Sequence, residues 1–201
     1  PNQQDFAVRT FGMPGGDGFL GVCFGNVITA TSPQPQRHTN WQATLWHEFA
    51  HVVTLSLTDN KMPRWLSEGI SVHEELQRDP SWGQKMNPTY RRMILTGELT
   101  PVGRLSTAFM SPASPVHLQF AYYQSALVIE FLVERFGFES VKALLADLAR
   151  NGEINAAIAR HTGPLETIEK EFDAFARELA EKLAPTVDWD EPSREQVDPT
   201  D

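Results

Sequence analysis

The segment His47-Glu48-Phe49-Ala50-His51 constrains this chain more than any other feature. On a helix, residues four apart lie one turn apart on the same face, so both imidazoles can bind a single Zn²⁺. Glu48 lies next to His47 in the sequence, and its carboxylate can reach a water molecule on the open side of such an ion. Glu68, which we expect on the following helix, can supply a third ligand. The spacing predicts one zinc ion on His47, His51 and Glu68, with Glu48 as the general base of a hydrolase.

The residues around this motif are almost all apolar, which predicts a helix that is buried nearly all round. They are Leu45, Trp46, Phe49, Ala50, Val52 and Val53. Two histidines and a glutamate inside a buried helix need a partner that offsets the cost of their desolvation, and a metal ion is such a partner. The alternative is a buried helix with two hydrogen-bonded histidines and a glutamate at the surface. The motif and its surroundings together favour zinc.

The wider stretch resembles the gluzincin clan of metallopeptidases, because Trp65-Leu66-Ser67-Glu68-Gly69 follows the first motif after a short gap. More narrowly, it is similar to bacterial peptidase-MA-like domains, which often lie beside tetratricopeptide repeats. The segment 120–125, the helix end near Gly137 and the strand segment 25–28 extend the resemblance. It implies a zincin-like fold, zinc-dependent hydrolysis of a peptide or protein substrate, and adjacent repeat domains in the full-length chain.

In that family, a tyrosine on the helix that contains 120–125 reaches the active site, where a hydroxyl can stabilise the oxyanion of the reaction. Tyr122 and Tyr123 are both candidates here. Helical periodicity aligns Tyr123 with Glu130 and Glu134, which we expect to face solvent, whereas Tyr122 aligns with an apolar stripe. We therefore expect Tyr122 to be the oxyanion donor, with Tyr123 as the alternative.

The residues that orient the ligand imidazoles by hydrogen bonds are harder to predict from the sequence. Thermolysin-like gluzincins have an acid four residues after the third ligand, and this chain has Val72 at that position. Ser71, Glu74 and Glu75 are candidate substitutes for orienting a ligand imidazole. For the two acids, a solvated place on the helix surface is the default expectation.

The segment Gly21–Asn26 is the expected edge strand, where substrate backbone can bind by strand addition. Gluzincin aminopeptidases have an acid on this strand that binds the free amine of the substrate, and this segment has no acid. That departure favours an endopeptidase over an aminopeptidase. Two other interpretations stay open: a zinc-bound, non-catalytic interaction module beside repeat domains, and a zinc hydrolase that acts on a non-peptide amide.

The overall pattern predicts an α+β fold, in which a small N-terminal antiparallel sheet packs on the HExxH helix and a mostly helical C-terminal half follows. The segments Phe19–Phe24 and Asn26–Thr31 predict a strand pair or one long bulged strand. Capping residues and apolar periodicity predict helices over 40–58, 63–77, 88–97, 118–136, 138–150, 153–161 and 164–183. Residues 101–116 are rich in proline and serine, and we expect a loop at the rim of the cleft.

The 201 residues suffice for one zincin-like metallopeptidase domain, which we assign to 1–183. The chain begins with Pro1 rather than Met, so we expect an N-terminally truncated or processed piece. Residues 184–201 hold −5 of the net charge of −9 and three prolines, which predicts an acidic tail or linker. The sequence has no basic stripe of the kind that binds nucleic acid and no run of 18 apolar residues. We therefore expect neither nucleic-acid binding nor a membrane span. The single cysteine excludes an internal disulfide but does not fix the compartment.

Overall fold

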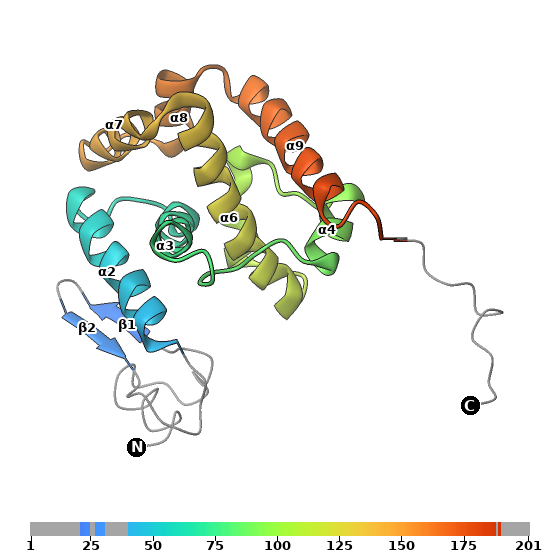
Figure 1. Cartoon of the computed structure of the whole chain (residues 1–201). Helices are drawn as coiled ribbons and strands as arrows, with labels where there is room; N and C mark the ends of the chain where they lie inside the picture. Colours follow the sequence, from blue (N-terminus) through green and yellow to red (C-terminus); the bar gives the residue numbers. More distant parts are fainter. Residues whose placement is uncertain (1–20, 25–26, 31–39, 188, 190–201) are drawn as a thin grey trace, which may run out of the picture.

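The computed structural model describes residues 21–24, 27–30, 40–187 and 189, and Figure 1 shows how they are arranged. Two short strands, β1 (Gly21–Phe24) and β2 (Val27–Ala30), pair antiparallel with Gly21 opposite Ala30. The helices that follow are α2 (Trp41–Leu57), α3 (Arg64–Arg78), α4 (Pro88–Leu95), α5 (Ser106–Met110), α6 (Pro115–Phe136), α7 (Phe138–Ala149), α8 (Ile154–Thr162) and α9 (Leu165–Lys182). A small antiparallel sheet and a mostly helical remainder, both predicted from the sequence, are confirmed.

Local capping explains where several helices begin and end. The Asn40 side-chain oxygen accepts a hydrogen bond from the Ala43 N–H at 3.1 Å at the start of α2. Asn87 caps α4 in the same way, with Pro88 in its first turn, where a missing N–H costs nothing. Gly137, at φ +78°, ends α6 in a conformation that residues with a Cβ rarely adopt. These signals are local, which is why the expected helix boundaries lie within a few residues of the observed ones.

Helix α6 runs through the middle of the molecule, and α3, α5, α7 and α9 all contact it (Figure 1). Because neighbours surround α6 on several sides, it has no wide solvent face. The expectation that Tyr123 lies on such a face is wrong, since Tyr123 is only 6% exposed. Its ring stacks on Tyr90 with centroids 4.9 Å apart, and its hydroxyl points at the Met86 sulfur.

Helix α2 contacts the two strands, α3 and α7, and its other side is exposed. Glu48, Ala50 and Thr54 lie on the buried side. Large apolar side chains on the outer side remain 38–59% exposed: Trp41, Leu45, Phe49, Val53 and Leu57. The prediction that this helix is buried nearly all round is therefore wrong for the described part of the chain. An apolar residue every fourth position follows the helix surface as a stripe, and nothing in the sequence says which stripe meets the core.

Residues 101–116, predicted as a loop, contain the 3₁₀ turn Val102–Arg104 and helix α5. Phe109 of α5 is buried, and its ring meets the ring of Tyr122 edge-on at 5.1 Å. The correction has a simple reason, because single-turn helices are too short to show periodicity in a sequence. Helix α5 contacts α3 and α6, and the place of this segment at the rim of the cleft stays a prediction.

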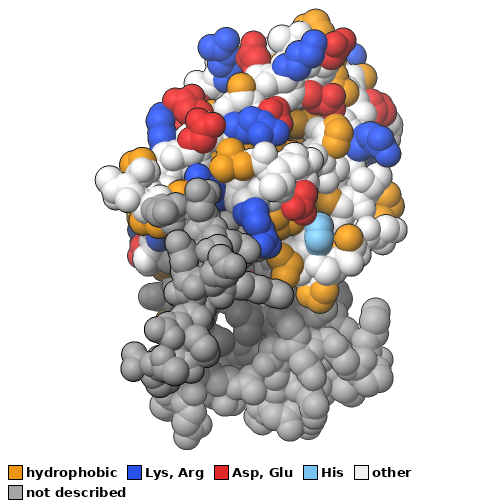
Figure 2. All heavy atoms as spheres, turned by 90° about the vertical axis from the view of Figure 1, so that its right-hand side faces the viewer, with side chains coloured by type: hydrophobic (Ala, Val, Ile, Leu, Met, Phe, Trp, Pro, Cys, Tyr) orange, Lys and Arg blue, Asp and Glu red, His pale blue; other side chains and the backbone are white. Residues whose placement is uncertain are grey.

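Among the described residues, no helix is long and apolar enough to cross a membrane. On the face in Figure 2, lysine and arginine side chains are interspersed with aspartate and glutamate. Helix α9 ends at Lys182, next to the predicted boundary at 183, and the Trp189 ring lies 4.5 Å from the Arg91 guanidinium. Residues 188 and 190–201 of the predicted acidic tail lie outside the described residues, as does the start of the predicted first strand.

Candidate metal centre

Helices α2 and α3 bring the three predicted ligands together. His47 and His51 project from the same face of α2, with ring centroids 4.7 Å apart. Glu68 reaches them from α3, and its Oε2 lies 3.3 Å from His47 Nε2 and 3.4 Å from His51 Nε2. One candidate donor atom from each residue lies within 4.8 Å of the other two. One carboxylate oxygen thus faces two imidazole nitrogens, although the residues come from separate helices.

Hydrogen bonds at the far side of each ring set the orientation of both imidazoles. His47 Nδ1 lies 2.6 Å from Glu75 Oε1. His51 Nδ1 lies 2.8 Å from Ser67 Oγ and 3.1 Å from Ser71 Oγ. An imidazole that donates through Nδ1 presents the lone pair of Nε2 on its opposite side. Both Nε2 atoms accordingly face Glu68, which is the arrangement that a metal requires.

Of the three candidates from the sequence, Ser71 contacts the ring of His51 and Glu75 contacts the ring of His47. The default expectation of a solvated position is wrong for Glu75, whose side chain is only 12% exposed. It lies seven residues after Glu68, about two helical turns along the same face of α3. The Glu74 carboxylate points elsewhere, 3.9 Å from His73. Ser67 was not predicted; it precedes Glu68 directly, and its four-residue spacing from Ser71 puts both hydroxyls on one side of α3.

The charges in the cluster favour a bound cation. Burial alone would lower the pKa of the His47 imidazole, but hydrogen bonds with Glu68 and Glu75 outweigh it and raise the pKa to about 10. Burial works in the opposite direction on Glu68, whose pKa nonetheless falls well below its usual range because of hydrogen bonds with both histidines. Without a metal, the carboxylates thus hold a proton on His47. Two imidazoles and one carboxylate are a ligand set that catalytic zinc sites use, so these residues fit the ion.

Glu48 lies on the side of α2 that meets the sheet, and its side chain is buried. Burial raises the pKa of its carboxyl, while the two neighbouring imidazoles lower it in part. Strand β1 passes directly over this residue at Gly21. A Cβ added at Gly21 would lie 2.9 Å from Glu48 Cγ and 2.7 Å from Thr44 Cγ2, closer than real Cβ contacts. Only glycine lets the strand come this close to the predicted general base.

Helices α3 and α6 cross in close contact at Gly69. A Cβ there would lie 2.6 Å from the backbone oxygen of Ser125, so any larger residue would push the helices apart. Since Gly69 follows Glu68 and Ser125 follows Tyr122 by three residues, this crossing brings Glu68 and Tyr122 to the same region. The two motifs of the sequence, Glu-Gly and Tyr-x-x-Ser, meet at a single backbone contact.

The Tyr122 hydroxyl accepts a hydrogen bond of 2.7 Å from Arg64 Nη2. The Nε of the same arginine lies 3.2 Å from Glu68 Oε1, which links the tyrosine to the ligand cluster. Burial and the nearby Glu68 carboxylate raise the pKa of Tyr122, so its hydroxyl keeps its proton at neutral pH. Of the two candidate tyrosines, Tyr122 lies beside the cluster, and Tyr123 is buried against Tyr90. Arg64 was not predicted; its position four residues before Glu68 is the only signal in the sequence.

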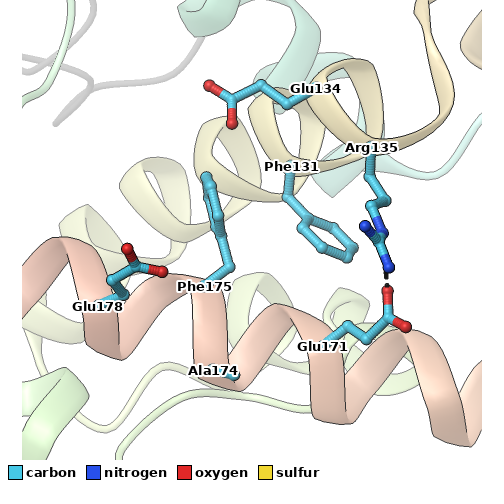
Figure 3. A pocket seen from close by; sticks show the side chains of 7 residues that line it. All are labelled: Phe131, Glu134, Arg135, Glu171, Ala174, Phe175 and Glu178. Carbon is cyan, nitrogen blue, oxygen red and sulfur yellow. Dashed lines mark hydrogen bonds and ion pairs between the residues drawn. The ribbon is translucent and has the colours of Figure 1, made fainter.

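A different hollow lies between α6 and α9 (Figure 3), lined by Phe131, Glu134, Arg135, Glu171, Ala174, Phe175 and Glu178. Arg135 Nε pairs with Glu171 at 3.3 Å across it. No histidine or cysteine lines this hollow, and within the described residues the one group suited to a metal is that of His47, His51 and Glu68. The candidate metal centre and the hollow are therefore separate features.

Comparison with known proteins gives one match. The family model described as the peptidase MA superfamily matches residues 18–177, a range that includes both strands, the ligand helices and α6. No curated protein and no solved structure matches the chain.

Proposed function

Because the chain belongs to the peptidase MA superfamily, we propose that it is a zinc-dependent metallopeptidase. The superfamily is typically zinc-dependent. The observation that best supports the proposal is the convergence of His47, His51 and Glu68, with Glu68 Oε2 3.3 and 3.4 Å from the two Nε2 atoms. A zincin-like arrangement of the domain is part of the same proposal.

In this proposal, His47, His51 and Glu68 hold one zinc ion. When bound, zinc supplies Lewis-acid chemistry, making a water molecule more acidic and drawing electron density from a carbonyl oxygen. Glu75 and the serines at 67 and 71 hold the imidazoles so that Nε2, rather than Nδ1, faces the ion. Such outer partners commonly change metal affinity by about 10–100-fold.

Glu48 acts as the general base. Its carboxylate takes a proton from the attacking water and then delivers that proton to the leaving amine, so that the peptide C–N bond breaks. Burial beneath Gly21 supports this role, because a carboxylate with a raised pKa holds the proton better between the two steps. The Tyr122 hydroxyl donates a hydrogen bond to the oxyanion that forms on the former carbonyl oxygen.

Strand β1 binds the substrate backbone. Among the described residues its strand partner is β2, and in this proposal the peptide adds along the opposite edge of β1. Its start at Gly21 lies against Glu48, so a peptide added to that edge runs past the general base. Since Gly21–Asn26 contains no acid to bind a free amine, we propose internal cleavage rather than removal of N-terminal residues.

The test uses zinc-loaded protein and a substrate library that contains peptides with blocked N-termini, the same peptides with free N-termini, and small non-peptide amides. Glu48→Gln should retain zinc yet lose about 10²–10⁴-fold in turnover, since it removes the proton acceptor and no ligand. Glu130→Gln is the matched control, because burial also raises the pKa of the Glu130 carboxyl, and this variant should keep wild-type activity. Equal activity in Glu48→Gln and wild type would remove Glu48 from the mechanism.

The same library separates the other interpretations. Cleavage only of peptides with a free amine would refute the endopeptidase preference. No cleavage of any peptide by the zinc-loaded wild type would favour the non-catalytic module beside repeat domains. Hydrolysis of small amides without hydrolysis of peptides would favour the non-peptide amidase.

A further inference from the structure

Arg64 lies in the first turn of α3 and joins two groups that the proposed mechanism uses separately. Its Nε lies 3.2 Å from Glu68 Oε1, and its Nη2 donates to the Tyr122 hydroxyl at 2.7 Å. The guanidinium also lies over the Phe109 ring, 5.3 Å from its centroid. The side chain is half exposed, so its position depends on these contacts rather than on deep burial.

The two oxygens of Glu68 thus have different partners. Oε2 faces both histidines, whereas Oε1 faces Arg64. An arginine on Oε1 holds the carboxylate in one rotation and leaves Oε2 as the oxygen presented to a metal. Loss of the arginine would free the carboxylate to rotate, which costs metal affinity because the ligand must then be ordered upon binding.

The contact with Tyr122 acts on the other half of the mechanism. Because Nη2 donates to the phenol oxygen, the hydroxyl hydrogen has to point to a different acceptor. That hydrogen is the one which the proposed mechanism gives to the oxyanion. A cation beside the phenol also favours a stronger donor, since it stabilises negative charge on the oxygen.

We propose that Arg64 is a positioning residue that holds the metal ligand Glu68 and the oxyanion donor Tyr122 in their working orientations at the same time. The proposal rests on the proposed function, and it requires the planar fork of arginine. Lysine has the same charge but only one nitrogen, which cannot take the place of both Nε and Nη2. The ring of Phe109 holds the fork in its plane by a cation–π contact.

The experiment measures the zinc dissociation constant by competition with a chelator, and kcat at saturating zinc. The variants are Arg64→Gln, Arg64→Lys, Tyr122→Phe and the double variant Arg64→Gln/Tyr122→Phe. Arg135→Gln is the matched control, because Arg135 also pairs with a glutamate at 3.3 Å but lies between α6 and α9. Thermal unfolding of each variant verifies that it is folded.

Arg64→Gln should weaken zinc binding by about 10–100-fold, the usual effect of losing an outer partner, and Arg64→Lys should restore little of it. Arg135→Gln should change it by less than about twofold. In kcat, the double variant should lie within about threefold of Tyr122→Phe, since residues that act through one another give non-additive losses.

Zinc affinity of Arg64→Gln within about twofold of wild type would overturn the proposal, as would full restoration by lysine or additive losses in kcat. If the wild type cleaves no peptide, the proposed function fails, and zinc affinity alone decides: unchanged affinity overturns the role of Arg64, and a loss of about 10–100-fold supports it.

Discussion

Two carboxylates in this protein are largely shielded from solvent and have similar surroundings, Glu68 at 13% exposure and Asp147 at 4%. Glu68 lies among His47, His51 and Arg64, and Asp147 lies among Arg150, Arg160 and His161. Asp147 is almost fully buried, with Arg150 Nη2 at 2.6 Å on one oxygen and Arg160 and His161 on the other. In both places, although burial opposes ionisation, hydrogen bonds from nitrogen donors lower the pKa of the carboxyl.

The two carboxylates differ in whether the groups that contact them can give up a proton. Asp147 has two arginines, which do not lose their protons at any ordinary pH, so its charge is permanently balanced. The Oε2 of Glu68 faces only imidazoles, which can exchange a proton for a metal. Glu68 also has a second buried acid near it, Glu48, whose pKa is raised. A buried acid alone therefore does not indicate a functional site; exchangeable partners and a neighbouring base do.

The strongest test of this contrast replaces one histidine in each cluster. His51→Ala should lose stoichiometric zinc at neutral pH and all turnover, because two ligands remain where three are needed. His161→Ala should retain zinc, and its unfolding midpoint should fall by several degrees, because it removes one of the donors to buried Asp147. Metal analysis and thermal unfolding of both variants decide the matter. Full zinc retention in His51→Ala would mean that the two clusters do not differ as argued.

The second test asks whether the surroundings of Glu68 act in chemistry as well as in metal binding. Tyr122→Phe should reduce kcat by about 10²–10³-fold with zinc content unchanged, because it removes one hydrogen-bond donor to the oxyanion. Tyr123→Phe, which removes the hydroxyl beside Met86, should have a mild effect on kcat. Steady-state kinetics with a single peptide measures both. The reverse ranking would transfer the role to Tyr123, against its buried position.

A smaller effect is expected from replacing the acid that contacts a candidate ligand ring, Glu75 beside His47. Glu75→Gln should weaken zinc binding by about 10–100-fold, since the amide holds the His47 ring less firmly than a carboxylate. Glu74→Gln, one residue earlier and without a contact to either ligand ring among the described residues, is the control and should bind zinc normally. Chelator competition measures both affinities. Comparable values for the two variants would show that Glu75 does not support the site.

The smallest effect, taken per unit of pH, is the pH dependence of zinc binding. The pKa of His47 is raised to about 10, so the metal-free protein holds a proton there that zinc must displace. The zinc dissociation constant should therefore fall by about tenfold per unit as the pH rises between about 7 and 9. Affinities measured at several pH values, corrected for protonation of the chelator, test this. A flat profile would indicate that His47 is already neutral, and that Glu68 is no more exchangeable than Asp147.

Much of the site was predictable because the spacing and capping signals that define it involve residues close together in the sequence. The spacing of His47 and His51 requires only that the segment be helical, and caps such as Asn40 and Asn87 define the helix starts without any distant contact. Glu68 was predictable from the resemblance of its own short motif to a known family. The choice of Tyr122 as oxyanion donor stays a prediction, and the structure adds only that Tyr122 lies beside Arg64 and Glu68. The expectation that Tyr123 faces solvent was wrong, since both tyrosines lie in a helix with neighbours on several sides.

The sequence by itself determined the residue types of the candidate ligands, their spacing on α2 and the order of the helices, because these depend on residues a few positions apart. Only the tertiary structure decided that Glu75 rather than Glu74 orients His47, that α2 leaves an apolar stripe exposed, and that Arg64 joins Glu68 to Tyr122. These outcomes depend on how α2, α3 and α6 pack, and above all on the close crossing at Gly69. Packing of that kind depends on pairs of residues far apart in the chain, such as Gly69 and Ser125, whose proximity no local periodicity encodes.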